Sequence, residues 1–223
     1  MIQSDDEHDI AMFFASSVHD MKNSLGLMAL MLEKAVRAGE RDSGNLLYEV
    51  RRINSNLMHL LALYKLGNKL YPFDPTDVAI SHLFHDLQLQ SDILLKSRNV
   101  QLEVEVDEDL TWHFDFDLVF GVLGSAVNNA FKYTENTIRL TATATDDEIE
   151  LRVEDNGCGF PSSMLVDGRG GLNGIDFAKG STGLGLYFAD RVAGLHRNQQ
   201  RRGSIRLENG GTLGGGCFIL TLP

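Results

Sequence analysis

The chain has 223 residues, of which 43% are hydrophobic and 23% charged, and its formal net charge is −11. This balance is typical of folded globular domains and excludes a disordered chain. Because an acidic chain with a pI of about 5.0 repels phosphate groups, we expect neither nucleic acid nor an anionic membrane surface as a partner.

No apolar run approaches the ~20 residues needed to span a bilayer. The N-terminal stretch MIQSDDEHDI is acidic, the reverse of a signal peptide. Cys158 and Cys217 could form one disulfide, but two reduced thiols in the cytosol are the favoured reading. These features predict a cytoplasmic protein with no membrane segment in this chain.

Apolar residues recur at alternating spacings of four and three between residues 8 and 69, which predicts two helices joined by a loop at 37–45. The stripe consists of Phe14, Val18, Met21, Leu25, Met28, Leu32 and Ala35, followed by Leu46, Val50, Ile53, Leu57, Leu60 and Tyr64. A helical hairpin cannot bury such a stripe alone. We therefore expect a homodimer in which two hairpins form a four-helix bundle. The alternative is a hairpin docked on the second half of the same chain.

The two prolines of YPFDPTD, at 71–77, indicate a linker between domains 1–70 and 71–223. Beyond it we expect helices at 82–98 and 117–134, strands at 100–106, 137–145 and 148–155, and two strands around a glycine-rich turn in 203–223. This order predicts an α+β fold, with helices packed on one face of a sheet.

Three polar patterns occur in this second half. Ser125, Asn129, Lys132 and Tyr133 share one face of the helix at 117–134, although such a face can be plain surface. Asp155 has the parity of the inward apolar residues of its strand, and a buried carboxylate needs a hydrogen-bond donor such as a ligand amino group. The alternative for Asp155 is an ordinary Asp-Asn-Gly turn.

Glycines form the rest of these patterns. Gly157 and Gly159 directly follow Asp155 and allow the backbone to approach a ligand closely. Gly180, Gly183 and Gly185 precede a predicted helix, and glycine-rich turns that lead into helices often bind phosphate.

In this order the patterns resemble the ATP-binding domain of sensor histidine kinases, which shares a superfamily with gyrase and MutL ATPases. NNAFKYT is similar to the N box, DNGCGF to the G1 box, GSTGLGL to the G2 box, and GCFILTLP to the last strand. Upstream, HDMKNSL resembles the H box of the kinase dimerisation domain. The resemblance implies a dimeric four-helix bundle of hairpins, followed by an α/β sandwich ATP-binding domain of the Bergerat type.

The resemblance also implies roles for individual residues, with ATP and Mg²⁺ as the bound groups. Asn129 would ligate Mg²⁺, Lys132 would contact phosphate, and Tyr133 would lie against adenine or ribose. Asp155 would accept from the adenine amino group. The glycines of the G1 box and the start of the G2 helix would bind the nucleotide through their backbone, namely Gly157, Gly159, Gly183, Leu184, Gly185 and Leu186.

Three positions depart from the family pattern. Ser125 stands where members usually carry a second Asn, and where the related ATPases carry a Glu that activates water. Ser24 replaces a common proline, so we expect a straighter helix. The ATP lid at 161–181 lacks a clear two-phenylalanine F box and supplies only Phe177.

His19 is the candidate phosphoacceptor. Its neighbours Val18 and Met21 belong to the apolar stripe, so His19 lies on the flank of the helix. A neutral imidazole is a good nucleophile near pH 7. The resemblance makes Asp20 the base and orienter, although adjacent side chains do not face each other on a helix. It also makes Asn23 a residue that positions water for a phosphatase reaction.

We therefore expect a histidine kinase that autophosphorylates His19 from ATP and passes the phosphoryl group to an Asp of a response-regulator receiver domain. One alternative is a phosphotransferase or adaptor with an inert ATP-binding domain. Another is a Ser/Thr kinase of the anti-sigma type, but such proteins lack the H-box hairpin.

Overall fold

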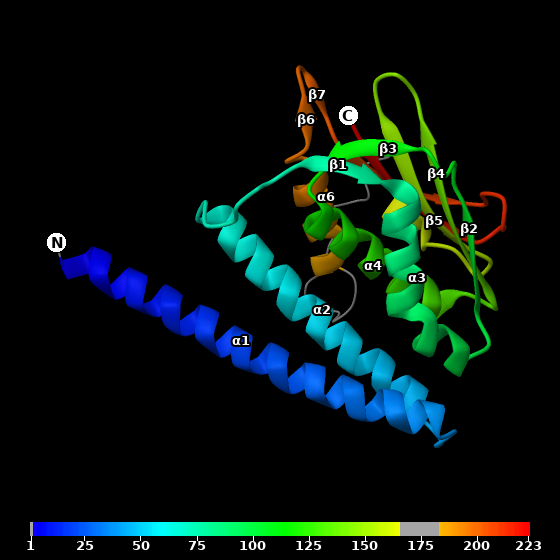
Figure 1. Ribbon diagram of the computed structural model, residues 1–223, viewed down its shortest axis with the longest axis horizontal. Coiled ribbons are helices and arrows are strands. Elements are labelled where there is room, and N and C mark those ends of the chain that lie inside the picture. The colour runs from blue at the N-terminus through cyan, green and yellow to red at the C-terminus, as the bar shows by residue number, and fades with distance from the viewer. Residues whose placement is uncertain (1, 166–182) are drawn as a thin grey trace. The chain divides into compact units, whose positions relative to one another are not determined.

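The structure is a computed structural model that describes residues 2–165 and 183–223. In the first helix, side chains are described from Ser17 onward, with His19 excepted. The chain divides into two compact units, Met1–Tyr71 and Pro72–Pro223. Figure 1 labels the helices and strands of both units.

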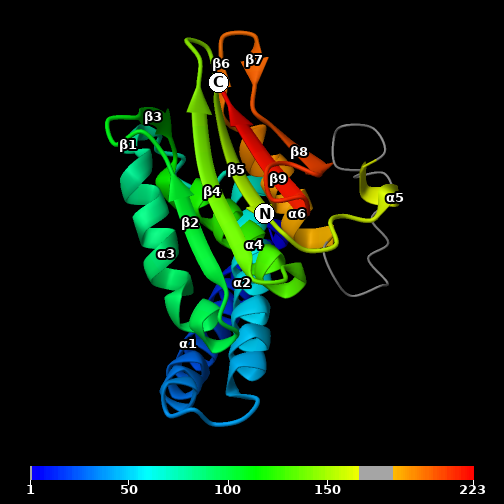
Figure 2. The same ribbon diagram turned by 90° about the vertical axis from the view of Figure 1, so that its right-hand side faces the viewer.

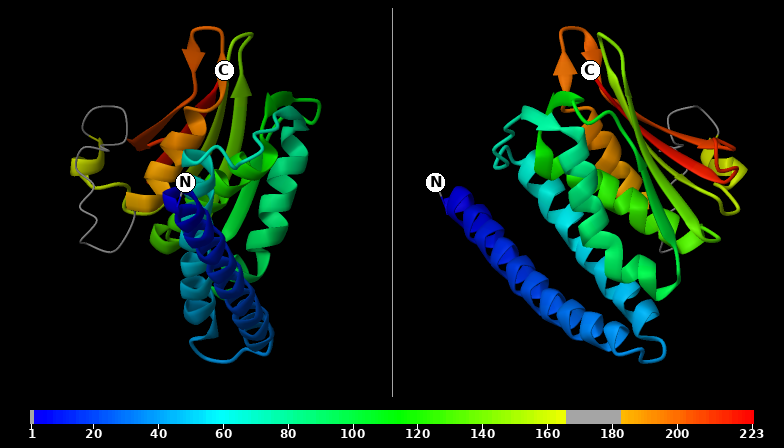
Figure 3. Two further views of the ribbon diagram at one scale, coloured as in Figure 1. Left: turned by 90° about the vertical axis from the view of Figure 1, so that its left-hand side faces the viewer. Right: turned by 45° about the vertical axis from the view of Figure 1, so that its right-hand side comes forward.

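The first unit is a helical hairpin, as the apolar spacing predicts. Helix α1 spans Ile2–Arg37 and α2 spans Ser43–Gly67, and the two helices run antiparallel and pack against each other (Figure 3). Asp42 adopts a left-handed conformation in the turn, with φ 61°. The Arg51 guanidinium forms an ion pair across the helices with the Glu33 carboxylate at 2.8 Å.

Part of the predicted apolar stripe remains exposed on this hairpin. The exposed members are each about half accessible and are spaced seven residues apart, namely Met21 and Met28 on α1 and Leu46, Ile53 and Leu60 on α2. Because apolar surface favours burial, this stripe is a face that a second apolar surface could cover.

The second unit alternates strands and helices. Its elements are β1 (Thr76–Ala79), α3 (Ile80–Ser97), β2 (Gln101–Glu105), β3 (Thr111–Phe114), α4 (Phe116–Tyr133), β4 (Thr137–Ala144), β5 (Ile149–Asp155), α5 (Ser162–Leu165), α6 (Gly183–Ala193), β6 (Arg197–Asn198), β7 (Arg201–Arg202), β8 (Ser204–Asn209) and β9 (Gly216–Leu222). Five strands form one sheet in the order β2-β4-β5-β9-β8, in which β2 and β4 are parallel and the other pairs antiparallel. The pairs β1–β3 and β6–β7 form two short ladders.

The core of this unit lies between the sheet and helices α3, α4 and α6, which cover one of its faces (Figure 2). Alternate strand residues such as Leu140, Leu151 and Leu220 are fully buried against the helices. The other face carries charged side chains, including an Arg139–Glu103 pair at 2.8 Å. This arrangement confirms the predicted α+β fold with helices on one face.

A buried histidine joins the ends of α4 and α6. His196 Nε2 accepts a hydrogen bond from the Asp115 backbone N–H at 3.1 Å, and Nδ1 donates to the Val192 carbonyl at 2.9 Å. Burial lowers the pKa of His196, which keeps the ring neutral and able to accept. Asp115 in turn caps α4, because its Oδ1 accepts from the Leu118 N–H at 3.0 Å. His196 is therefore structural.

Candidate functional site

The C-terminal half of α4 carries the polar face that the sequence singled out. Asn129 and Tyr133 line a pocket beside the sheet. Lys132 is exposed, and its ammonium lies 5.0 Å from the centroid of the Tyr133 ring. The buried stripe of α4, which includes Val122 and Ala126, holds this face in place against the core.

Asp155 ends β5 and points inward, as its parity predicts. Its side chain is only 7% exposed, and it lines the same pocket. Asp155 Oδ1 accepts a hydrogen bond from the Gly157 N–H at 2.7 Å, which fixes the carboxylate and the start of the following turn together.

Gly157 and Gly159 each occupy a position that favours glycine, for different reasons. A β-carbon at Gly157 would collide with the Tyr133 carbonyl oxygen at the end of α4. Gly159 has φ +74°, a left-handed conformation that favours glycine. The glycines therefore allow the segment after β5 to pass against α4, where Gly159 lines the pocket.

Helix α6 begins at Gly183, so Gly183, Leu184, Gly185 and Leu186 form its first turn. The first N–H groups of a helix have no partner within the helix and suit an anion. Leu186 lines the pocket. A β-carbon on Gly185 would lie 3.1 Å from Ser125 Oγ, so the start of α6 approaches α4 closely at the position where the family pattern has Asn.

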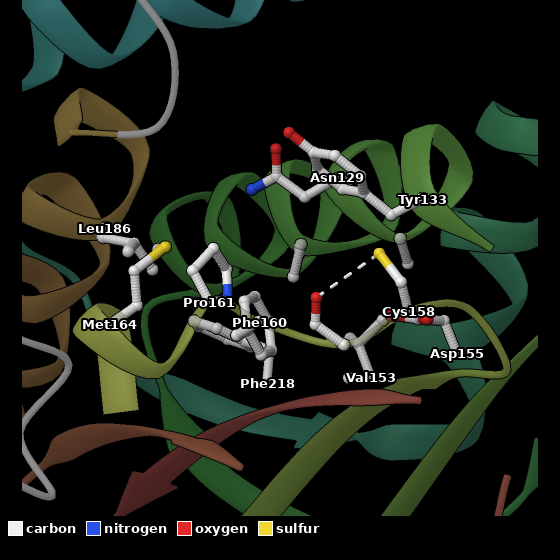
Figure 4. Close-up of a pocket in the computed structure, with 14 residues that line it drawn as sticks. Asn129, Tyr133, Val153, Asp155, Cys158, Phe160, Pro161, Met164, Leu186 and Phe218 are labelled. Atoms are coloured by element: carbon white, nitrogen blue, oxygen red, sulfur yellow. Dashed lines mark hydrogen bonds between the residues drawn. The ribbon is translucent and has the colours of Figure 1, made fainter. Parts of the chain in front are cut away.

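These elements enclose one cavity of about 260 Å³ (Figure 4). It is lined by Ala126, Asn129, Ala130, Tyr133, Val153, Asp155, Cys158, Gly159, Phe160, Pro161, Met164, Leu186, Gly216 and Phe218. Its walls are mostly apolar, with the amide of Asn129 and the carboxylate of Asp155 as polar groups. Such a cavity suits a flat, apolar ligand with a few hydrogen-bonding groups.

Nine lining residues were not identified from the sequence as site residues, namely Ala126, Ala130, Val153, Cys158, Phe160, Pro161, Met164, Gly216 and Phe218. Phe218 has the inward parity of β9, so alternation could have indicated it. Gly216 begins β9 at the end of a glycine-rich stretch, and only the fold reveals how closely it approaches Asp155. Most of the lid predicted at 161–181, including Phe177 and Gly180, lies outside the described residues.

The predicted phosphoacceptor region lies in the first unit, on α1. His19 is within the helix, but its side chain lies outside the described part of the structure. Asp20 and Asn23 are exposed. Ser24 Oγ donates to the Asp20 carbonyl at 3.0 Å, and α1 continues through Ser24 without a break.

The fit to Mg²⁺ depends on oxygen donors. Among the described residues, no group of three or more His, Cys, Asp or Glu side chains could hold a metal ion. Asn129 lines the cavity, and its side-chain amide carries one oxygen. This fits Mg²⁺, which usually keeps several waters and takes its remaining ligands from phosphates.

In the described ranges, no helix combines the length and apolar character needed to cross a membrane.

Comparison with known proteins places this pocket in a family. Residues 115–223 match the family model of the histidine kinase-, DNA gyrase B- and HSP90-like ATPases. This range covers α4 to β9 and therefore contains every residue that lines the cavity.

Two curated relatives are a sensor protein and a sensor-like histidine kinase. The chain is 30% identical over 188 residues to the sensor protein BceS of Halalkalibacterium halodurans, a match that covers 79% of this chain and 53% of BceS. It is 24% identical over 225 residues to the sensor-like histidine kinase SenX3 of Mycobacterium tuberculosis, covering 95% of this chain and 53% of SenX3. The chain thus spans about half the length of these relatives.

A solved structure shows the same fold. The catalytic domain of the histidine kinase ThkA superposes with a TM-score of 0.56 at 23% identity, covering 67% of this chain and 95% of that domain. The mixed sheet with helices on one face is therefore the fold of a histidine kinase catalytic domain.

Proposed function

We propose that this chain, which the comparisons support as the catalytic core of a sensor histidine kinase, phosphorylates His19 from ATP. The observation that carries this proposal is the single cavity that unites Asn129 and Tyr133 of α4, Asp155 of β5 and Leu186 of α6. Three separate sequence motifs meet there around one nucleotide-sized space.

Each lining group has a role in holding the nucleotide. The buried Asp155 carboxylate accepts a hydrogen bond from the adenine amino group, which offsets the cost of its burial. Tyr133 lies against the adenine or ribose. Lys132, which is exposed beside Tyr133, contacts a phosphate, and the first N–H groups of α6 at Gly183 to Leu186 bind the phosphates.

Asn129 holds Mg²⁺ through its side-chain oxygen. When bound, Mg²⁺ would supply positive charge to the phosphates. One protein oxygen fits this ion, because Mg²⁺ usually keeps several waters and takes other ligands from phosphates. Ser125, which packs at Gly185, takes no part as a base, because a hydroxyl is a weak base at neutral pH.

The chemical step forms a bond between an imidazole nitrogen of His19 and the γ-phosphorus, while the bond from that phosphorus to the bridging oxygen breaks and ADP leaves. The second imidazole nitrogen then loses its proton to the Asp20 carboxylate. Asn23, one turn further along α1, positions a water for removal of phosphate from the partner protein.

The phosphoryl group passes from His19 to an aspartate of a response-regulator receiver domain. The protein acts as a homodimer, and the exposed heptad stripe on the hairpin supports this assignment. Since ATP and receiver domains are found in the cytoplasm, the reaction takes place there.

Incubation with γ-labelled ATP and Mg²⁺ tests the kinase reaction. The expected result is an acid-labile label on the wild-type chain that is absent from His19→Ala. The matched control is His85→Ala, which removes an exposed histidine of α3 and should keep the label. Label that persists in His19→Ala contradicts the assignment of His19.

Calorimetry separates the kinase from an adaptor with an inert ATP-binding domain. The kinase proposal predicts binding of ATP with Mg²⁺, weakened about tenfold or more in Asn129→Ala because a charge-assisted contact is lost. A wild-type chain that binds no nucleotide would support the adaptor instead.

A further inference from the structure

The side-chain amide of Asn209 forms two hydrogen bonds with the backbone of Phe160. Asn209 ends β8, and its Oδ1 accepts a hydrogen bond from the Phe160 N–H at 2.7 Å. Its Nδ2 donates to the Phe160 carbonyl oxygen at 2.9 Å. The amide therefore satisfies both backbone groups of one residue, as a neighbouring strand would.

Phe160 is part of the nucleotide pocket, whereas Asn209 does not line it. The Asn209 side chain lies very close to this segment, because a β-carbon at Gly159 would lie 2.7 Å from Asn209 Oδ1. Asn209 is exposed, so its hydrogen bonds lie at the rim of the fold and outside the hydrophobic core. The main effect expected of this contact is on the position of Phe160, with little effect on the packing of the domain.

The turn that follows Asn209 holds the end of β5 by two more contacts. The Gly215 N–H donates to the Asp155 carbonyl at 3.1 Å. On the other face of the sheet, Thr212 Oγ1 donates to Glu154 Oε2 at 2.6 Å. The β8–β9 turn thus fixes both the end of β5, which carries Asp155, and the segment that contains Phe160.

The same turn leaves little space around the two groups that it positions. A β-carbon at Gly216 would lie 2.9 Å from Asp155 Oδ2 and 3.0 Å from Phe160 Cε2. The carboxylate of Asp155 and the ring of Phe160 are therefore held at a set spacing on one wall of the cavity.

We propose that Asn209 is a positioning residue for nucleotide binding, which acts by holding Phe160 and the wall beside Asp155 in place. This inference rests on the proposed binding of ATP in the cavity. Because Asp155 is assigned to the adenine, loss of the two Asn209–Phe160 hydrogen bonds weakens the binding of every adenine nucleotide to the same degree, whatever its phosphate chain.

The side-chain chemistry specifies an amide. Asn209→Asp keeps an acceptor for the Phe160 N–H but places a second oxygen against the Phe160 carbonyl, where no proton is shared. Asn209→Ala removes both hydrogen bonds without adding charge. Comparing the two variants separates the effect of losing the Nδ2 donor from the effect of adding a negative charge.

Calorimetric titration of the full chain with ATP and with ADP, each with Mg²⁺, tests the proposal. We expect both variants to weaken both nucleotides about tenfold, which corresponds to the loss of about one net hydrogen bond or two. The ratio of the ATP and ADP affinities should stay at its wild-type value. The matched control is Asn198→Asp, the same charge change at an exposed position of β6, which should leave both affinities unchanged.

Thermal unfolding of the free proteins distinguishes positioning from general stability. The unfolding midpoints of the Asn209 variants should stay close to that of the wild type. Wild-type affinity in both variants, or a loss of affinity matched by a comparable fall in the unfolding midpoint, overturns the inference alone. A wild-type chain that binds neither nucleotide overturns the proposed function and this inference with it.

Discussion

The two cysteines occupy opposite environments within the ATP-binding unit. Cys158 is an exposed free thiol that lines the nucleotide pocket. Burial, together with the nearby Glu154 carboxylate, raises the pKa of Cys217 to about 12. At pH 8 only about one Cys217 thiol in ten thousand is therefore the reactive thiolate.

We expect iodoacetamide at pH 8 to alkylate the native protein at Cys158 alone, and ATP with Mg²⁺ to slow that alkylation. Peptide mass spectrometry identifies the modified residue and follows its rate. Cys158→Ala should leave the folded protein unlabelled, and in denaturant both thiols of the wild type should react. Rapid labelling of Cys217 in the folded state, or a Cys158 rate that ATP does not change, would contradict this expectation.

Local sequence patterns predicted the long elements well. The helix expected at 117–134 is α4 at Phe116–Tyr133, and the strand expected at 148–155 is β5 at Ile149–Asp155. Their apolar periodicity extends over several turns or alternations, so the signal is strong. The inward position of Asp155 followed from the same alternation.

The short ladders were not predicted, because two to four residues carry no measurable period. Strand β1 begins at Thr76, inside the segment expected to be a linker, and exists because it pairs with β3 around Phe114. The role of Asn209 was also invisible, since its partner Phe160 lies 49 residues away and only the folded sheet brings the two together.

The close approach of α4 and α6 makes a prediction about two elements together. In Gly185→Ala the new β-carbon would lie 3.1 Å from Ser125 Oγ, the nearest atom to it and the only neighbour within 4 Å among the described residues. The start of α6 should shift away from α4, and calorimetry should show weaker ATP binding by about three- to tenfold.

Ser125→Ala provides the compensating change. It removes the crowded oxygen, so the double variant with Gly185→Ala should recover most of the lost affinity, which a double-mutant cycle measures as coupling between the sites. Equal losses in the single Gly185→Ala and the double variant would show that the glycine is needed for a reason other than the spacing of the helices.

At the scale of the whole molecule, the hairpin leaves part of its apolar stripe exposed, and the proposed homodimer would cover it. Ile53 and Leu60 lie two helical turns apart on α2, and each is nearly half exposed in the single chain. Covering such a stripe with the same stripe of a second copy produces a symmetric interface, because each residue then meets the matching face. The net charge of −11 opposes association, so apolar burial must outweigh it.

Ile53→Glu should therefore prevent formation of the proposed dimer and give a monomer, since it places a carboxylate in an interface that is otherwise apolar. Sedimentation velocity measures the change in mass, and circular dichroism should show an unchanged helix content because Ile53 already contacts solvent in the single chain. Leu89→Glu, an equally drastic change at a 63% exposed leucine of α3, is the matched control and should remain dimeric. A dimer that survives Ile53→Glu, or that Leu89→Glu disrupts equally, would place the interface elsewhere than on the hairpin stripe.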